Sequence, residues 1–187
     1  YQWSNGLTTQ DISQLFGDSL YSCLITDSFG CFLDTSFLIT QPSKIIVNSL
    51  VNNIACYGDS TGSITLNISG GINPYYLDWG SIDTNNLIAG FYNYTVIDSN
   101  GCLLQDSVEV LQEDQIDYNI NVLNVQCYGD STGFIEIDMQ LNSGLPPYQF
   151  SWTGPNSFSS TFEDIYTLFA GSYSLTIMDA SMCIVDI

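Results

Sequence analysis

The chain has 187 residues, of which 45% are hydrophobic, 13% are aromatic and only 11% are charged. Twenty Asp and Glu residues stand against one basic residue, Lys44, so the formal net charge is −19. Nucleic acids and anionic membranes are bound through Lys and Arg side chains, so this composition excludes both partners. No apolar run is long enough for insertion into a membrane.

The residue types that most catalytic sites require are missing. The chain has no His, so a Ser or Cys nucleophile has no imidazole base. Lys44 is the only basic residue, which is too few for a phosphoryl-transfer clamp. Two carboxylates are enough for a glycosidase, but the recurring Asp residues of this chain fall at turns, where Asp caps backbone amides. We therefore predict that the segment is not an enzyme.

A tandem repeat organises the chain. Its first half opens with Cys-Tyr-Gly-Asp-Ser-Thr-Gly, at residues 56–62 and unchanged at 127–133. Its second half runs from a Trp through Leu-x-Ala-Gly-x-Tyr to a closing Asp and Cys, and residues 1–42 repeat only this half. The sequence thus predicts the C-terminal part of a repeat at 1–42, a complete repeat at 43–113, and a repeat at 114–187 that lacks most of its last strand. We expect an internal segment of a longer protein, because the chain does not begin with Met.

Each repeat reads as short strands with one buried face. Apolar residues alternate with polar ones at 63–69 and at 135–141, and a second alternating strand follows at 92–96 and at 173–177. Gly70-Gly71 and Asn100-Gly101 indicate tight turns. The Trp residues are expected to fill the space between two sheets: Trp3, Trp79 and Trp152.

The Leu-x-Ala-Gly-x-Tyr run resembles the tyrosine corner of fibronectin type III and immunoglobulin-like domains, in which the Tyr hydroxyl bonds to backbone upstream. The first repeat has one extra residue between Leu15 and Tyr21, so its corner is expected to be distorted. Together these patterns predict an all-β fold of tandem immunoglobulin/fibronectin-III-like β-sandwich repeats, each stapled by a disulfide.

The cysteines follow the repeat. Because one cysteine opens each unit and another closes it, we predict Cys56–Cys102 and Cys127–Cys183 disulfides. Disulfides imply an oxidising compartment, which is the periplasm, the cell surface or the medium. Cys31 is expected to pair with a cysteine upstream of residue 1. Cys23 takes the place of a core residue of the other units and is expected to be a buried free thiol.

The sequence offers two candidate kinds of ligand site, a calcium site and a sugar-binding surface, each with a plain structural alternative. Calcium needs six to eight oxygen ligands, and the loops of Asp59 and Asp130 each supply one carboxylate, so turn capping is favoured over calcium for them and for Asp27, Asp98 and Asp179. Glu113, Asp114 and Asp117 at a unit junction are a better candidate for a cation, but a solvated acidic linker is favoured there. A sugar-stacking platform of Tyr57, Tyr75, Tyr76 and Tyr148 was the other hypothesis, for which core packing is the default.

The motifs taken together resemble the SprB-type repeat of Bacteroidota surface adhesins. The resemblance is carried by Cys56, Gly58, Gly62, Gly70, Gly71, Pro74, Tyr75, Trp79, Leu87, Gly90, Tyr92, Asp98, Gly101 and Cys102. The third repeat departs from the pattern, with Met182 in place of Gly101 and a longer stretch between Trp152 and Leu168. The resemblance therefore does not fix its last turn or its loop geometry.

The resemblance implies a function. Such adhesins are long, repetitive proteins that are exported by type IX secretion, displayed on the outside of the outer membrane and moved by the gliding machinery. The expected partners are extracellular surfaces or polysaccharide, with the secretion and gliding machinery contacted through other parts of the parent. The alternative is a spacer or a glycan-binding accessory module of a secreted hydrolase. Bacteroidota O-glycosylate Asp-Ser/Thr motifs, which makes Ser19, Ser60, Ser107 and Ser131 candidate glycosylation sites.

Overall fold

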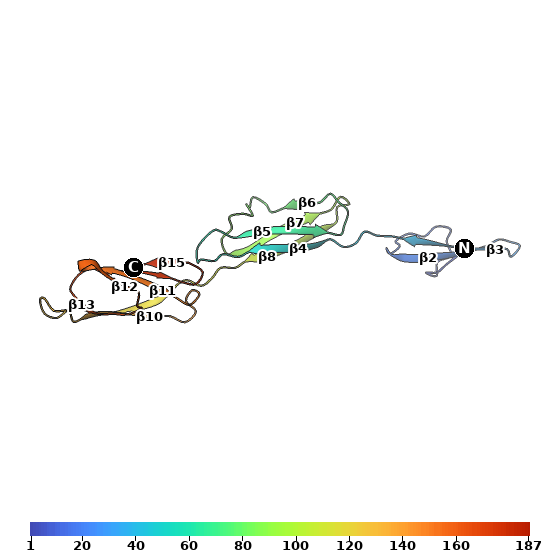
Figure 1. Ribbon diagram of the computed structural model, residues 1–187. Coiled ribbons are helices and arrows are strands. Elements are labelled where there is room, and N and C mark those ends of the chain that lie inside the picture. The colour runs from blue at the N-terminus through green and yellow to red at the C-terminus, as the bar shows by residue number, and fades with distance from the viewer. The chain divides into compact units, whose positions relative to one another are not determined.

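The structure is a computed structural model that describes all of residues 1–187 (Figure 1). It consists of strands and loops, with a single 3-10 turn at Pro155–Ser157. The predicted all-β fold class is confirmed, whereas the finer identity as an immunoglobulin or fibronectin type III domain stays a prediction. No helix of this structure has the length and apolar character needed to cross a bilayer.

The backbone divides into two compact units. One contains residues 1–46, 68–76 and 96–104, and the other contains 47–67, 77–95 and 105–187. The repeat boundaries at 42/43 and 113/114 stay predictions.

Residues 1–42 form one antiparallel sheet in the order β1-β2-β3. Its strands are β1 (Gln2–Trp3), β2 (Ser19–Thr26) and β3 (Phe32–Ile39). Trp3 lies opposite Cys23, and Tyr21 lies opposite Phe37. The Cys23 thiol is 1% exposed and unpaired, as predicted from its place among core residues.

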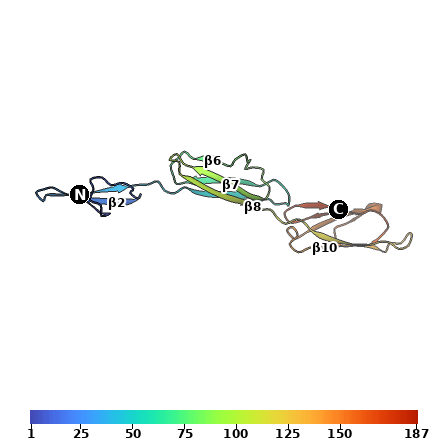
Figure 2. The same ribbon diagram turned by 180° about the vertical axis from the view of Figure 1, so that it is seen from behind.

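The second repeat forms two sheets. β4 (Ile46–Asn52) pairs with β5 (Ser63–Ser69), and a three-stranded sheet has the order β6-β7-β8. The strands of the second sheet are β6 (Tyr76–Asp78), β7 (Gly90–Ile97) and β8 (Leu103–Val110), which lie side by side in Figure 2. The predicted alternation is confirmed in β5, where Ile64 is buried, Leu66 and Ile68 are half-buried, and the intervening Thr65 and Asn67 are exposed.

The third repeat is a sandwich of two sheets, which Figure 1 shows as two layers. One sheet has the order β13-β10-β9 and the other β12-β11-β14-β15. Their strands are β9 (Tyr118–Leu123), β10 (Gly133–Met139), β11 (Gln149–Gly154), β12 (Phe158–Ser160), β13 (Ile165–Leu168), β14 (Ser174–Met178) and β15 (Ile184–Asp186).

Apolar residues from both sheets form the core of this sandwich. They are Ile116, Ile137, Trp152, Ile165, Leu168, Leu175, Ile177 and Cys183. In β10 the predicted alternation is seen from Ile137, which is buried, through the exposed Asp138 to the half-buried Met139, but the inclusion of Leu141 is wrong. Leu141 is 94% exposed, because β10 ends at Met139 and the chain turns at Asn142, which has φ 59°.

The three Trp residues differ in burial. Trp152 is 3% exposed in the core, as predicted, and its indole N–H donates to the carbonyl of Phe162 at 3.0 Å. Trp3 and Trp79 are only half-buried, so the prediction that each Trp fills its sandwich is met fully in the third repeat alone. Trp79 follows the last residue of β6 and packs on Tyr94 with ring centroids 5.2 Å apart.

The tyrosine corners form as predicted. The Tyr92 hydroxyl donates to the carbonyl of Ile88 at 2.7 Å, and the Tyr173 hydroxyl donates to that of Phe169 at 3.1 Å. In the first repeat, the extra residue changes the bond. The Tyr21 hydroxyl there accepts from the backbone N–H of Phe16 at 3.0 Å, so this corner is distorted as expected.

Candidate functional site

One disulfide links two repeats. It joins Cys56, which opens the second repeat, to Cys183, which closes the third, across 127 residues of sequence and with a Cα–Cα distance of 5.4 Å. The predicted pairings Cys56–Cys102 and Cys127–Cys183 are therefore wrong. Cys102, Cys127 and Cys31 are exposed and unpaired.

Strand length explains why the pairing within a repeat fails. In the third repeat, Cys183 lies beside Gln115 and Ile116, at the start of the repeat. β9 then carries the chain away for six residues before Cys127, which is roughly 20 Å at the rise of an extended strand. A disulfide requires Cα atoms within about 7 Å. The opening and closing cysteines of one repeat thus lie at opposite ends of the sandwich.

The opening loop of the second repeat is fastened to the end of the same repeat. The backbone N–H of Ile54 donates to the carbonyl of Leu111 at 2.9 Å, and the N–H of Leu111 donates to the Asn53 side chain at 3.0 Å. The N–H of Gly58 donates to the side-chain carbonyl of Gln112 at 3.0 Å. These bonds hold Cys56 next to the peptide that leads into the third repeat.

The disulfide closes over that connecting peptide. Cys56, Tyr57 and Asp59 form one wall of a pocket of about 330 Å³, whose other walls are residues 114–116 and 182–185. Cys183 is 8% exposed, and its sulfur lies 3.1 Å from the carbonyl oxygen of Ala55. We call this arrangement of residues 54–59, 112–116 and 182–185 the repeat junction.

The closing turn that presents each second cysteine is built around an Asp, as predicted. One carboxylate oxygen of Asp98 accepts the N–H groups of Asn100 and Cys102 at 2.9 and 2.8 Å. Asp179 accepts those of Ser181 and Cys183, both at 2.9 Å. Asp27 makes the same pair of bonds to Phe29 and Cys31 at 2.8 and 2.9 Å. The three carboxylates therefore shape the turns.

In the two later repeats the second carboxylate oxygen ties this turn to the loop before the Pro-Tyr motif. It accepts from Ile72 in the case of Asp98, at 3.0 Å, and from Leu145 in the case of Asp179, at 3.1 Å. Burial by itself raises the pKa of the Asp98 carboxyl. The N–H groups of Cys102, Ile72 and Asn100 outweigh that effect and lower its pKa below the ordinary value.

The turn keeps its shape without glycine in the third repeat. Gly101 has φ 80°, and Met182 at the equivalent place has φ 65°. Both donate their N–H to the carbonyl of the turn aspartate, at 3.0 and 3.1 Å. The turn that the resemblance left open therefore takes the same form in the third repeat, because the aspartate bonds hold Met182 in a left-handed conformation that glycine adopts without strain.

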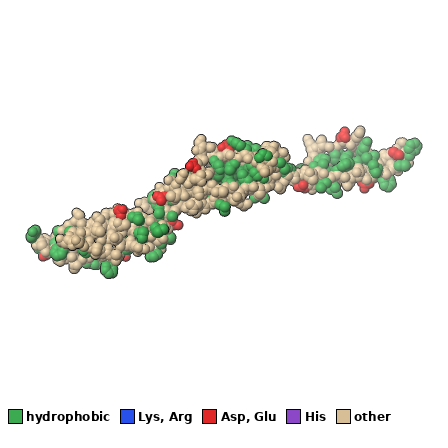
Figure 3. Space-filling view, turned by 45° about the horizontal axis from the view of Figure 1, so that its top comes forward, with side chains coloured by type: hydrophobic (Ala, Val, Ile, Leu, Met, Phe, Trp, Pro, Cys, Tyr) green, Lys and Arg blue, Asp and Glu red, His purple; other side chains and the backbone are tan.

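The acidic residues do not gather into a cation site. No group of three or more His, Cys, Asp or Glu side chains is placed to hold a metal ion. Asp59 and Asp130 are exposed in their loops, as are Glu113, Asp114 and Asp117 at the junction. On the face drawn in Figure 3, acidic side chains are scattered singly.

The four Tyr residues of the hypothetical sugar-binding surface fall into two groups, of which one is bonded within loops and the other is exposed. The hydroxyls of Tyr75 and Tyr148 donate to the carbonyls of Gly70 and Ser143, so these rings belong to the loop structure. Tyr57 and Tyr76 are 56% and 63% exposed. Sequence reasoning did not single out Tyr128, which is fully exposed, although its equivalence to Tyr57 was the available signal.

The candidate glycosylation sites differ in accessibility. Ser60 and Ser107 are exposed, whereas Ser19 and Ser131 are half-buried. Their modification stays a prediction.

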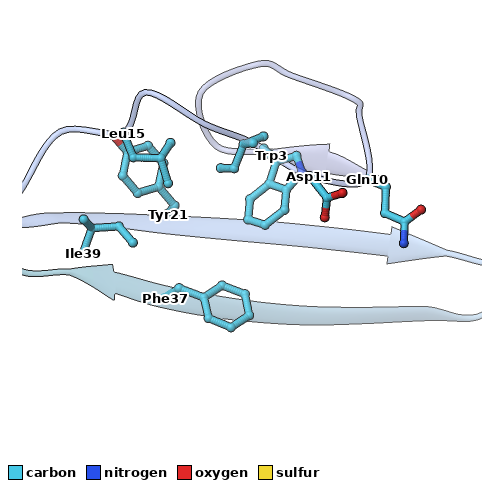
Figure 4. Close-up of a pocket in the computed structure, with 8 residues that line it drawn as sticks. Trp3, Gln10, Asp11, Leu15, Tyr21, Phe37 and Ile39 are labelled. Carbon is cyan, nitrogen blue, oxygen red and sulfur yellow. The ribbon is translucent and has the colours of Figure 1, made fainter.

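A further pocket, of about 310 Å³, lies on the sheet of the first repeat. Figure 4 shows Trp3, Tyr21 and Phe37 on its floor with Leu15 above them, and Gln10 and Asp11 at one side. Trp3 and Tyr21 are equivalent to Trp152 and Tyr173 of the third repeat, where Trp152 is a core residue. The pocket is therefore the inner face of a sandwich sheet.

A family model described as the SprB repeat matches residues 48–84 and 119–157. No match to a curated protein was found. The two matched stretches begin 71 residues apart, which is the offset of the repeated heptapeptide. The model therefore matches one stretch in the second repeat and one in the third, in agreement with the resemblance that the motifs carry.

Proposed function

We propose that the chain is a load-bearing segment of a long secreted filament on the outside of the outer membrane, a gliding-motility adhesin exported by type IX secretion. The observation that carries the proposal is the Cys56–Cys183 disulfide, which links one repeat to the next. A covalent link between repeats suits a protein that transmits force along its length, because it limits how far the linked chain can extend when a repeat unfolds.

The disulfide shortens the covalent path along the chain. A force applied at the two ends runs through residues 1–56, crosses to Cys183 and leaves through the last residues. The segment between the two cysteines, which spans 127 residues, therefore carries none of the force. Extended, this segment would add roughly 420–460 Å to the chain at 3.3–3.6 Å per residue. The junction therefore resists extension even if strands inside the loop separate.

The surface chemistry fits a filament exposed to its environment. One Lys and no Arg give trypsin-like proteases a single primary site. The partners we propose are extracellular surfaces or polysaccharide, and the secretion and gliding machinery would act on other parts of the parent. The net charge of −19 disfavours anionic ligands.

Electron microscopy of the intact parent protein, released from its native cell surface, tests the proposal. The expected result is a long fibre with beads about 30–40 Å long, as strands of about ten residues would give. A short stalk that ends in one large globular body would contradict it, and would favour a spacer or glycan-binding accessory module of a secreted hydrolase.

The motility part requires a separate experiment on cells. Deletion of the gene for the parent should abolish gliding on a surface, and inactivation of type IX secretion should remove the protein from the cell exterior. Normal gliding of the deletion strain would contradict the motility assignment and leave the filament assignment standing.

A further inference from the structure

Cys102 lies in a pocket built like the repeat junction. The pocket at Cys102 is lined by residues 41–45 and 102–104, and the junction pocket is lined by 114–116 and 182–185. Residues 43–45 correspond to 114–116 at the repeat offset of 71, and Cys102 corresponds to Cys183. Ile45 and Ile116 are equally buried, at 6% and 4% exposed. Two of the three walls of a repeat junction are thus present around Cys102.

The third wall distinguishes the two pockets. At Cys183 it is the opening loop of the repeat before, with Cys56 bonded to the sulfur. At Cys102 no such loop lies in the pocket, and the Cys102 thiol is exposed and unpaired. The first repeat carries no opening loop within this chain, because residues 1–42 contain only the second half of the repeat.

The opening loop of the third repeat, at 127–133, likewise lacks the partner that the opening loop of the second repeat has. It is identical in sequence to the loop at 56–62. Tyr57 is 56% exposed where its loop covers the junction, and Tyr128 is fully exposed. Cys56 is half-buried and bonded, whereas Cys127 is exposed and unpaired. The loop at 127–133 therefore presents an opening cysteine together with an uncovered aromatic ring.

We propose that Cys102 and Cys127 each form a disulfide with another SprB repeat of the same parent chain, so that a disulfide crosses every junction. Cys102 receives the opening cysteine of the repeat before it, and Cys127 receives the closing cysteine of the repeat after it. By the same rule, Cys31 closes a repeat and receives an opening cysteine. The inference rests on the proposed function in that further repeats flank this segment.

Each disulfide would form by thiol–disulfide exchange with an oxidised enzyme. Each new disulfide removes two protons and two electrons from a pair of thiols. The electrons pass to the disulfide of a dithiol–disulfide oxidoreductase: one thiolate attacks it to form a mixed disulfide, and the second thiolate displaces the enzyme as a dithiol. The exposure of Cys102 and Cys127 leaves both sulfurs open to that attack.

Non-reducing peptide mapping of the native parent protein tests the proposal. Free thiols are alkylated before digestion with a protease that cuts at Asp and Glu. We expect Cys102 and Cys127 to escape alkylation and to be linked to peptides from outside residues 1–187. Linkage of Cys102 to Cys56, linkage of Cys127 to Cys183, or alkylation of either Cys102 or Cys127 would overturn it.

Two further experiments show whether the partner cysteine belongs to the same chain or to a second copy of the parent. A non-reducing gel should show the parent at monomer mass, and an oligomer that reduces to monomers would overturn the assignment to the same chain. A Cys127→Ser variant should raise the count of alkylated cysteines outside this segment by one, whereas Cys23→Ser should leave that count unchanged. An unchanged count in both variants would contradict the proposal.

The result is independent of the test of the proposed function. A beaded fibre whose Cys102 is alkylated would keep the filament and overturn the disulfide at every junction. A stalk with one large head whose Cys102 and Cys127 are cross-linked would overturn the filament and keep the disulfide at every junction.

Discussion

Cys56 and Cys183 are bonded although they belong to different repeats and are separated by 127 residues. Cys56 is held by the bonds of its loop to residues 111–113, and Cys183 by the two N–H bonds to Asp179. Each cysteine is thus held in position by hydrogen bonds to the C-terminal part of its own repeat. The disulfide between them closes a covalent loop that spans 127 residues of two repeats.

Single-molecule pulling at the two ends of the chain should detect this loop. In the oxidised protein, the segment between the two cysteines cannot extend. After reduction, the fully extended length should increase by about 440 Å. Atomic force microscopy with and without dithiothreitol measures the difference, and equal lengths in the two conditions would show that the bond is absent.

Removal of the disulfide should destabilise the protein. Cys183→Ser frees a loop of 127 residues, and loops of this size contribute about 2–5 kcal/mol through the entropy of the unfolded chain. Urea unfolding should therefore show a lower free energy of unfolding. The comparison is made on residues 1–187 alone, where Cys102 is exposed and has no partner. There the matched control Cys102→Ser should stay within about 0.5 kcal/mol. Similar losses in both variants would contradict the pairing.

The closing turn of the third repeat should depend on its aspartate. Asp179 is 2% exposed and accepts three backbone N–H groups. In Asp179→Asn, the amide group that replaces one oxygen faces the N–H of Leu145 and cannot accept from it. We expect a loss of about 1–3 kcal/mol in the free energy of unfolding. Unchanged urea unfolding would show that the bond to Leu145 contributes nothing.

Acid should weaken the second repeat through Asp98. The folded-state pKa of this carboxyl lies below its ordinary value of 3.8. Its contribution to stability is therefore complete above the ordinary value and is lost as the pH falls below it through the folded-state pKa. Asp98→Asn should make the fall in melting temperature between pH 5 and pH 2 shallower. Asp34→Asn, at an exposed aspartate, serves as the control.

A glycine at the third closing turn should stabilise the protein. Met182 has φ 65°, which costs a non-glycine residue about 1–2 kcal/mol. The greater freedom of glycine in the unfolded chain offsets part of this, so Met182→Gly should raise the free energy of unfolding by up to about 1 kcal/mol. Conversely, Gly101→Ala should lower it, since the φ of 80° remains although no atom lies within 4 Å of the added carbon. Thermal unfolding that moves both variants in the same direction would contradict this explanation.

Local patterns predicted the elements that depend on local physics. The alternation at 63–69 indicated β5, because a strand with one buried face must alternate. The Leu-x-Ala-Gly-x-Tyr run predicted the hydroxyl-to-backbone bonds of Tyr92 and Tyr173, since donor and acceptor lie four residues apart. The end of β10 was missed, because the turn at Asn142 depends on a backbone conformation that the hydrophobic pattern does not report.

The sequence by itself determined the repeat, the alternating strands and the turn aspartates, all of which are encoded within one repeat of about 70 residues. It did not determine which cysteines pair. Repeat symmetry gives each unit an opening and a closing cysteine, and pairing within a unit and pairing across a junction are equally symmetric. Only the tertiary structure decided between them, because the strand after the connecting peptide carries Cys127 roughly 20 Å from Cys183, while the neighbouring repeat brings Cys56 to a Cα distance of 5.4 Å.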